Sequence, residues 1–426
     1  MIMMNLLKKT FLLSSLVGVM VITGCNSGNN TTTATPTQPV LNRNALNLIF
    51  VQSFESNPAA NNLSVTGFNH SLLFGQLLNQ ITNSQVSQIY ALIPSTNVIN
   101  GYPDMKPLQS IENFAVLNME SVVDSLTTDT TQAASVINQV IQGNTKGNYV
   151  FALPASVING VLSQLNLPSF SFVPLGNVNQ YIVVSINNQE QVTANTYNDG
   201  IIPSSTYPQL NLSTGAQCQE SSVTIKTDGK SPPGMSRNET VYFVRHVEAH
   251  PNGFEDGNYV CQGQWRAIGA PPVLLSKMGS LPDYVFSSDP SELIGGSNQQ
   301  VYSYVRPSLS VNPFTISYNM PLNLVESSQF QWYDAPALAQ FLFTGGSFND
   351  KTILVSWEHG NIQEAVYYLF NDIYNNPGLA AQVPQWGGND YDTIWKVRLD
   401  DKGNATFSNI CEGISESALP LSCPTF

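Results

Sequence analysis

The stretch ETVYFVRHVEAHP, residues 239–251, joins an apolar run to basic side chains that are scarce elsewhere in the chain. The 426 residues include 16 lysines and arginines and four histidines, yet Arg245, His246 and His250 fall within six positions. The run TVYFV is typical of a buried strand, so Arg245 and His246 stand at its carboxyl end. Ligands of α/β sheets bind at the carboxyl ends of strands, so this cationic pair indicates an anion site.

The composition excludes some classes of protein. With 42% hydrophobic residues, the chain is long enough for a sizeable core and for two domains. A formal net charge of -13 and a pI near 4.6 argue against nucleic acid as a partner, because that binding needs clustered lysines and arginines. The basic pair at residues 245–246 is therefore expected to act within one small site and not as part of an extended basic surface.

The first residues predict an export signal. Lys8 and Lys9 precede the apolar stretch FLLSSLVGVMVITG, which is too short for a membrane-spanning helix. Its end, ITGC, resembles the lipobox of bacterial lipoproteins, which implies cleavage before Cys25 and lipidation of its thiol. We expect a signal peptide at residues 1–24, a flexible tether at 25–44, and a lipid-anchored protein of the bacterial cell envelope. Asn26 after the cysteine favours the outer membrane.

Four further cysteines, an even number in an exported chain, predict two disulfides. Three connectivities are possible. We favour Cys411 with Cys423 and Cys218 with Cys261.

The chain contains an internal repeat. LIFVQSFESNP at 48–58 matches VYFVRHVEAHP at 241–251, an offset of 193 residues. Later pairs match in the same order, and the offset only grows: NLSVTGFNHS at 62 with NYVCQGQWRA at 258, IYALIPS at 89 with VFSSDPS at 285, KPLQSIENF at 106 with RPSLSVNPF at 306, YVFALPASVINGVL at 149 with ILVSWEHGNIQEAV at 353, and YNDGI at 197 with ICEGI at 410. Loop insertions into a duplicated domain produce this pattern.

Each half alternates short apolar runs with amphipathic stretches. In the second half these are TVYFVRH, CQGQWRAIGAPPVLLSKMG, YVFSS, APALAQFLFTG, TILVSW, NIQEAVYYLFNDIY and DTIWKVRL. Such alternation predicts α/β domains whose sheets are covered on both faces. We place the two domains at residues 45–213 and 214–426, as a tandem duplication.

Three motifs of the second half resemble the histidine phosphatase superfamily, which has the phosphoglycerate mutase-like fold. VRHVE supplies Arg245 and His246, SYVRPSLS supplies Arg306, and VSWEHGNI supplies His359. Val247 stands where the family has a glycine. The resemblance implies two three-layer α/β/α domains of this fold, of which residues 45–213 are a degenerate copy.

The resemblance also implies a reaction. His246 would attack phosphorus and become a transient phosphohistidine, while Arg245, Arg306 and His359 hold the phosphoryl oxygens. An acid would protonate the leaving alcohol; we favour Glu358, with Glu326 and Asp289 as alternatives. No cofactor or metal is implied. An export signal favours hydrolysis of a phosphorylated small molecule or other phosphoester over a mutase reaction in metabolism.

The first half lacks the reactive residues. Gln52, Ser53, Lys106 and Ala155 match Arg245, His246, Arg306 and His359. Its apolar runs survive, so we expect the two copies to pack face to face as an intramolecular pseudo-dimer. The lost residues also keep open the alternative of a catalytically inactive binding protein with an inherited fold.

Other polar residues have plainer interpretations. Glu55 and Glu248 occupy matching positions, as do His70 and Arg266, and we interpret all four as structural. We expect His250 at the surface. A metal site formed by His246, Glu248 and His250 is a further alternative, which the charge of Arg245 opposes.

Overall fold

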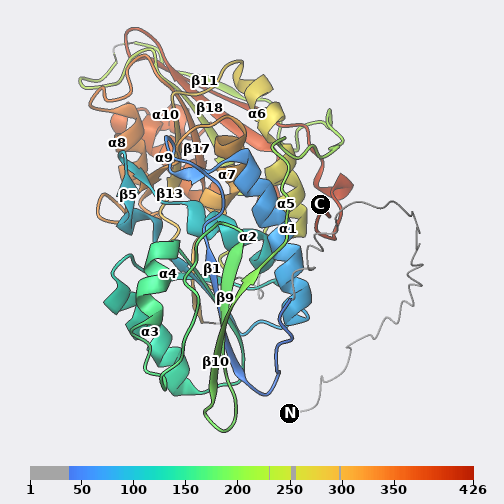
Figure 1. Ribbon diagram of the computed structural model, residues 1–426. Coiled ribbons are helices and arrows are strands. Elements are labelled where there is room, and N and C mark those ends of the chain that lie inside the picture. The colour runs from blue at the N-terminus through green and yellow to red at the C-terminus, as the bar shows by residue number, and fades with distance from the viewer. Residues whose placement is uncertain (1–37, 230, 251–255, 297–298) are drawn as a thin grey trace, which may run out of the picture. The chain divides into compact units, whose positions relative to one another are not determined.

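Two large β-sheets organise the computed structural model, which describes residues 38–229, 231–250, 256–296 and 299–426 (Figure 1). The predicted signal peptide and the lipidation site Cys25 lie outside the described residues. Within the described part, no helix is long and apolar enough to cross a membrane. Mixed helices and strands confirm the α/β class.

The first sheet has six strands in the order β10-β9-β1-β8-β4-β7. Strand β1, in the middle of the sheet, is buried along its whole length, which is typical of a sheet that is covered on both faces. It pairs in parallel with β8 and antiparallel with β9. The strands are β1 (Leu46–Gln52), β4 (Gln88–Leu92), β7 (Val122–Leu126), β8 (Gly147–Leu153), β9 (Gln180–Ile186) and β10 (Val192–Asn198).

The second sheet has the order β11-β19-β18-β12-β17-β13-β16. Apart from the added edge strand β11, it repeats the first sheet strand for strand, with the same parallel and antiparallel pairings. The strands are β11 (Thr224–Lys226), β12 (Thr240–Arg245), β13 (Tyr284–Ser288), β16 (Asn323–Val325), β17 (Thr352–Trp357), β18 (Thr393–Leu399) and β19 (Ala405–Cys411).

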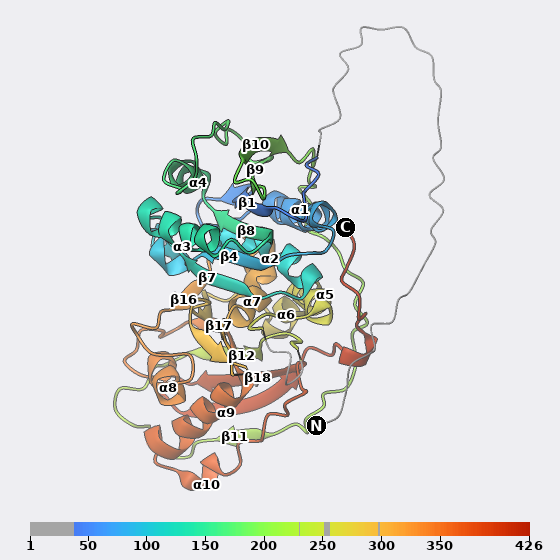
Figure 2. The ribbon, with the colours of Figure 1, turned by 90° about the horizontal axis from the view of Figure 1, so that it is seen from below.

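Helices cover both faces of each sheet (Figure 2). Alternation along the strands explains this: Leu48 and Phe50 pack in one apolar cluster with the helices α3 and α4, while Ile49 and Val51 pack in another with α1 and α2. The helices of the first half are α1 (Val65–Thr82), α2 (Lys106–Asn118), α3 (Thr130–Gly143) and α4 (Ala155–Leu162). Those of the second half are α5 (Cys261–Gly269), α6 (Pro271–Met278), α7 (Arg306–Ser317), α8 (Ala335–Phe343), α9 (His359–Tyr368) and α10 (Pro377–Ala380).

Short elements complete the chain. They are the two-stranded pairs β2 (Ser56–Asn57) with β3 (Asn62–Leu63), β5 (Val98–Ile99) with β6 (Tyr102–Pro103), and β14 (Leu293–Gly295) with β15 (Val301–Ser303), and the helical turns η1 (Pro94–Thr96), η2 (Leu369–Ile373) and η3 (Glu416–Ala418). In the sequence, the hairpin β14–β15 lies between β13 and α7, and the hairpin β5–β6 lies between the matching elements β4 and α2.

The two sheets share one apolar cluster, formed by α1 and α2 from the first half and α5, α6 and α7 from the second. Helix α1 contacts α7, and α2 contacts α5. Polar contacts also join the two halves, between α5 and α2 and between β7 and β15. The side chain of Gln264 donates to Asn113 at 2.6 Å, and the N–H of Asp124 donates to Ser303 Oγ at 3.0 Å. Residues from both halves therefore belong to one continuous core.

The disulfide pairing that we favoured from the sequence is wrong. The structure pairs Cys218 with Cys411 and Cys261 with Cys423, with Cα atoms 5.3 and 4.3 Å apart. The carboxyl-terminal segment runs along α5, where Trp265 Nε1 donates to Ser422 O at 2.8 Å. That path carries the last cysteine to the start of α5.

Candidate functional site

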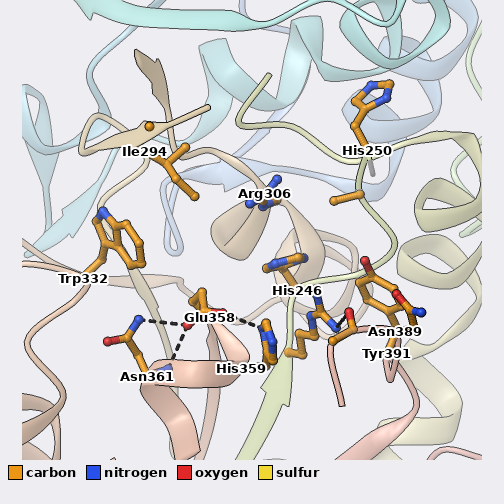
Figure 3. A pocket seen from close by; sticks show the side chains of 14 residues that line it. His246, His250, Ile294, Arg306, Trp332, Glu358, His359, Asn361, Asn389 and Tyr391 are labelled. Carbon is orange, nitrogen blue, oxygen red and sulfur yellow. Dashed lines mark hydrogen bonds and ion pairs between the residues drawn. The ribbon is translucent and has the colours of Figure 1, made fainter. Parts of the chain in front are cut away.

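Side chains from the ends of two neighbouring parallel strands and the starts of two helices meet at a cavity of about 900 Å³ (Figure 3). Arg245 ends β12, and Glu358 and His359 follow the end of the adjacent strand β17. Arg306 is the first residue of α7. The structure brings together all five residues that the sequence singled out, including His246.

His246 is held with one nitrogen ready to react. The residue is 2% exposed, and its Nδ1 lies 2.8 Å from the carbonyl oxygen of Val247. A carbonyl only accepts hydrogen bonds, so Nδ1 carries the proton and Nε2 keeps its lone pair. Figure 3 shows the ring between Arg306 and His359.

Electrostatics keep this imidazole neutral. Burial lowers the pKa of His246 well below its usual value, and the nearby charges of Arg306, Arg245 and His359 lower it further. The hydrogen bond to Val247 opposes this effect without reversing it. A neutral imidazole with a free Nε2 is a competent nucleophile at and below neutral pH.

The guanidinium groups of two arginines line the cavity. Arg245 uses Nη1 to bond the carbonyl of Gly388 at 2.6 Å, and its guanidinium lies 4.0 Å over the ring of Tyr391. The guanidinium of Arg306 lies 5.0 Å over the ring of Tyr304. The Nε atoms of both arginines are buried and have no acceptor among the described residues. Guanidinium groups that line a cavity are suited to bind an oxyanion.

A serine links the backbone directly after His246 to the helix that begins with Arg306. Ser310 Oγ accepts from the N–H of Val247 at 2.9 Å and donates to the carbonyl of Arg306 at 2.6 Å. Val247 does not adopt a positive φ, which explains why a valine fits where the resembled family has a glycine.

Glu358 and His359 act as a pair. Glu358 caps α9, where its Oε2 accepts from the N–H of Asn361 at 2.8 Å, and its Oε1 lies 2.5 Å from Nδ1 of His359. Burial alone would raise the pKa of Glu358, but His359 and the N–H groups of Gly360 and Asn361 lower it to about 2. Glu358 is therefore ionised and orients His359.

The other carboxylates that we considered as acids lie elsewhere. Asp289 is buried and accepts from the N–H and hydroxyl of Ser291, and Glu326 lies near Ser328; neither lines the cavity. His250, which we expected at the surface, does line it, with Nε2 3.1 Å from Asp256 and 13% of its side chain exposed. The surface prediction was wrong because the segment after the strand turns back against residue 259 in an isolated bridge.

Sequence reasoning missed the cavity's aromatic walls, Trp332 and Tyr391, and the amides of Asn361 and Asn389. Trp332 precedes α8, and Tyr391 precedes β18. Asn361 carried a signal, because it lies three residues after Glu358 in a capping arrangement. Trp332, Asn389 and Tyr391 lie in loops, where no apolar periodicity indicates which side chains face a cavity.

A buried ion network stands behind the site, and the first half has a matching one. Arg266 bonds Glu248 and Glu412 at 2.7 Å each. In the first half, His70 bonds Glu55 and Asp199 at 3.0 Å each. These contacts confirm the structural interpretation of His70, Arg266, Glu55 and Glu248.

Two of the four matching positions of the first half, Gln52 and Lys106, are engaged in other contacts. Gln52 donates to the carbonyls of Asn177 and Gln180 at 2.6 and 2.7 Å, and Lys106 pairs with Asp104 at 2.7 Å. No nucleophilic imidazole stands among them. Across the described parts of both halves, no group of three or more potential ligands could hold a metal ion.

No protein-family model matches the chain, and no curated protein matches it. One solved structure that it resembles is the protein histidine phosphatase SixA complexed with tungstate. The identity is 16%, the likeness covers 41% of this chain and 97% of that one, and the TM-score is 0.29. Another is a Nakamurella multipartitia protein described as a phosphohistidine phosphatase SixA, with 14% identity, coverage of 41% and 89%, and a TM-score of 0.27. At these scores the likeness carries no argument about activity.

Proposed function

We propose that this chain is an exported phosphomonoesterase that acts through a phosphohistidine on His246. One observation carries the proposal: a buried, neutral imidazole with a fixed tautomer shares one cavity with the guanidinium groups of Arg245 and Arg306. A phosphomonoester carries between one and two negative charges at neutral pH, and these groups supply matching positive charge.

The reaction has two displacements at phosphorus. Nε2 of His246 forms a bond to phosphorus with its lone pair, the ester P–O bond breaks, and the leaving oxygen keeps that electron pair. Water then forms a new P–O bond and gives up a proton to the solvent of the cavity, the P–N bond breaks, and the imidazole recovers its lone pair. Arg245, Arg306 and His359 stabilise the negative charge on the phosphoryl oxygens in both steps.

Glu358 takes a different role from the one that the sequence favoured. A carboxylate with a pKa of about 2 holds no proton to donate at neutral pH. Its contacts with His359 and Asn361 support a positioning role. The leaving oxygen is therefore protonated by water from the open cavity.

Release of inorganic phosphate from phenyl phosphate by the purified chain tests this function. We expect turnover by the wild type and none by His246→Ala, with no effect of chelators. Equal inactivity of both proteins over many phosphoesters and pH values would favour the alternative, a catalytically inactive binding protein. Loss of activity on chelation that zinc restores would favour the metal site.

We further propose that the two halves are a tandem duplication of a phosphoglycerate mutase-like three-layer domain. The equal strand orders and the matching ion networks support this origin. So do Gly67 and Gly263, at matching positions, where an added Cβ would lie 2.0 and 2.4 Å from the carbonyl oxygens of Glu55 and Glu248. The contacts of α1 with α7 and of α2 with α5 are equivalent under the repeat, as the two-fold arrangement of a pseudo-dimer requires.

The lipid anchor also remains a proposal, supported by the sequence ITGC. Cys25→Ser should block lipidation, so the variant should stay unprocessed or move to the soluble fraction. A processed variant that remains in the outer membrane would contradict the anchor.

A further inference from the structure

The cavity has a cationic part and an aromatic wall. Figure 3 shows Trp332 and Ile294 on one side of His246 and Arg306, with Tyr391 on the other. Trp332 comes from the segment before α8, and Ile294 comes from the hairpin β14–β15. A bound phosphoryl group would occupy the cationic part, so the rest of the substrate must pass along these walls.

Trp332 is held rigidly from several sides. Its indole Nε1 donates to the carbonyl of Leu293 at 3.0 Å, and its backbone N–H donates to Oε2 of Glu292 at 2.9 Å. Its carbonyl accepts from Nε1 of Trp357 at 2.7 Å, and its ring lies 4.8 Å from that of Tyr304. A side chain fixed in this way loses little entropy when a ligand binds.

The fixed orientation also determines what Trp332 can recognise. Its one hydrogen-bonding atom is already used by backbone, so the indole offers the cavity an apolar face. Neighbouring Ile294 and Gly295 add no charge to this wall. A flat apolar group fits here, because aromatic rings stack favourably on such a surface.

The proton donors in the cavity favour the same kind of substrate. Glu358 is ionised, so it holds no proton for a leaving group. A leaving group that needs no strong acid is therefore preferred. A phenol has a pKa of about 10, whereas an aliphatic alcohol resembles water, at about 15.7. A phenolate thus departs far more readily than an alkoxide.

We propose that the substrate is an aryl phosphomonoester whose aromatic ring stacks on Trp332. The inference rests on the proposed phosphatase function. It makes Trp332 the residue that determines specificity for the leaving group, while the cationic side chains determine recognition of phosphate.

Two esters of similar size, phenyl phosphate and cyclohexyl phosphate, test the inference in the full chain. We expect the wild type to hydrolyse phenyl phosphate with much the higher kcat/KM. Trp332→Leu should lower kcat/KM for phenyl phosphate about tenfold, the upper range for an aromatic pair, and leave cyclohexyl phosphate nearly unchanged. Trp332→Phe should restore most of the preference. Tyr367→Leu, at an aromatic residue of α9 that is 46% exposed, should change neither ester.

The phenyl ester is intrinsically more reactive than the cyclohexyl ester, and this difference is the same for every variant. A change in the ratio of the two kcat/KM values between wild type and Trp332→Leu therefore reports stacking alone. Equal loss for both esters in Trp332→Leu, or equal hydrolysis of both by the wild type, would overturn the inference while leaving the phosphatase function intact. If the wild type hydrolysed neither ester nor any other phosphomonoester, the proposed function and this inference would both fail.

Discussion

Arg245 and Arg306 set the protonation of the imidazole that lies beside them. Burial and these two charges lower the pKa of His246, so its reactive neutral form persists into mildly acidic solution. Activity that depends on this form falls only when the pH drops through the lowered pKa. The acid side of the pH profile therefore reports the electrostatics of the site.

Removing one of these charges should move that profile. In Arg306→Gln, kcat/KM at neutral pH should fall roughly 10²–10³-fold, because one oxyanion partner is lost. The pKa of His246 should rise, so activity should begin to fall at a higher pH than in the wild type. Profiles of kcat/KM against pH check this, with Lys351→Gln, at a basic residue paired with Asp283 near the surface, as the control. An acid limb that stays in place would contradict the electrostatic account.

Individual site residues were predictable where a local motif coincided with a strand end. Arg245 and His246 stand at the end of one apolar run and His359 two residues after another, while Arg306 begins a helix that is buried along almost its whole length. Trp332 and Tyr391 were not predictable, because their place in the cavity depends on the path of loops. The protonation of Glu358 was also hidden, since it depends on His359 and on capping geometry.

At the scale of elements, the two hydrogen bonds of Ser310 Oγ join the backbone after β12 to the first turn of α7. In Ser310→Ala, the buried N–H of Val247 loses its acceptor, which should lower the free energy of unfolding by about 1–3 kcal/mol. Urea unfolding measures the loss. Ser308→Ala is a matched control, because buried Ser308 bonds only Val305 in the same helical turn. If Ser308→Ala cost as much as Ser310→Ala, this fastening role would be refuted.

The ion networks of the two halves should respond differently to pH. Burial alone would lower the pKa of His70, but Asp199 and Glu55 outweigh burial and raise it. The pKa in the folded state then exceeds the unfolded value of about 6.5, so this stabilisation is complete below that pH. It is lost as the pH rises through the raised pKa. Arg266 in the second half stays charged throughout.

Substitution of His70 tests this difference. The free energy of unfolding of His70→Gln should lie further below that of the wild type at pH 6 than at pH 9. Urea unfolding at both pH values gives the two gaps, in which other titrating groups cancel. A gap that is constant or widens with pH would show that His70 is not protonated in the folded protein.

Most strands and helices could be predicted from apolar periodicity, but their boundaries could not. The stretch CQGQWRAIGAPPVLLSKMG, which we expected as one amphipathic segment, divides at Ala270 into α5 and α6. The matching α1 continues unbroken. Pro271 and Pro272 account for the division, because proline lacks the N–H that a continuous helix needs. Strand β11 and the hairpins were too short to show a period.

At the scale of the whole molecule, both sheets turn one face to the same apolar cluster. Residues of that cluster come from both halves, among them Phe114 of α2 and Phe314 of α7, each 1% exposed or less. The first half therefore covers surface that the second half would otherwise expose to water.

The second half produced alone, residues 214–426, should consequently be less stable and tend to aggregate. Light scattering and thermal unfolding, with the chain from residue 45 onward as reference, measure both properties. An isolated half that is monomeric, equally stable and equally active would show that the first half is an independent module.

Detection of phosphate on His246 during turnover tests the central claim most directly. The full chain is mixed with phenyl phosphate, quenched in alkaline denaturant, which preserves phosphohistidine, and digested for mass spectrometry. We predict an acid-labile phosphate on the peptide that contains His246, formed within the time of one turnover and absent from His246→Asn. Release of phosphate by the wild type with no phosphopeptide, or with the phosphate on another residue, would contradict the account.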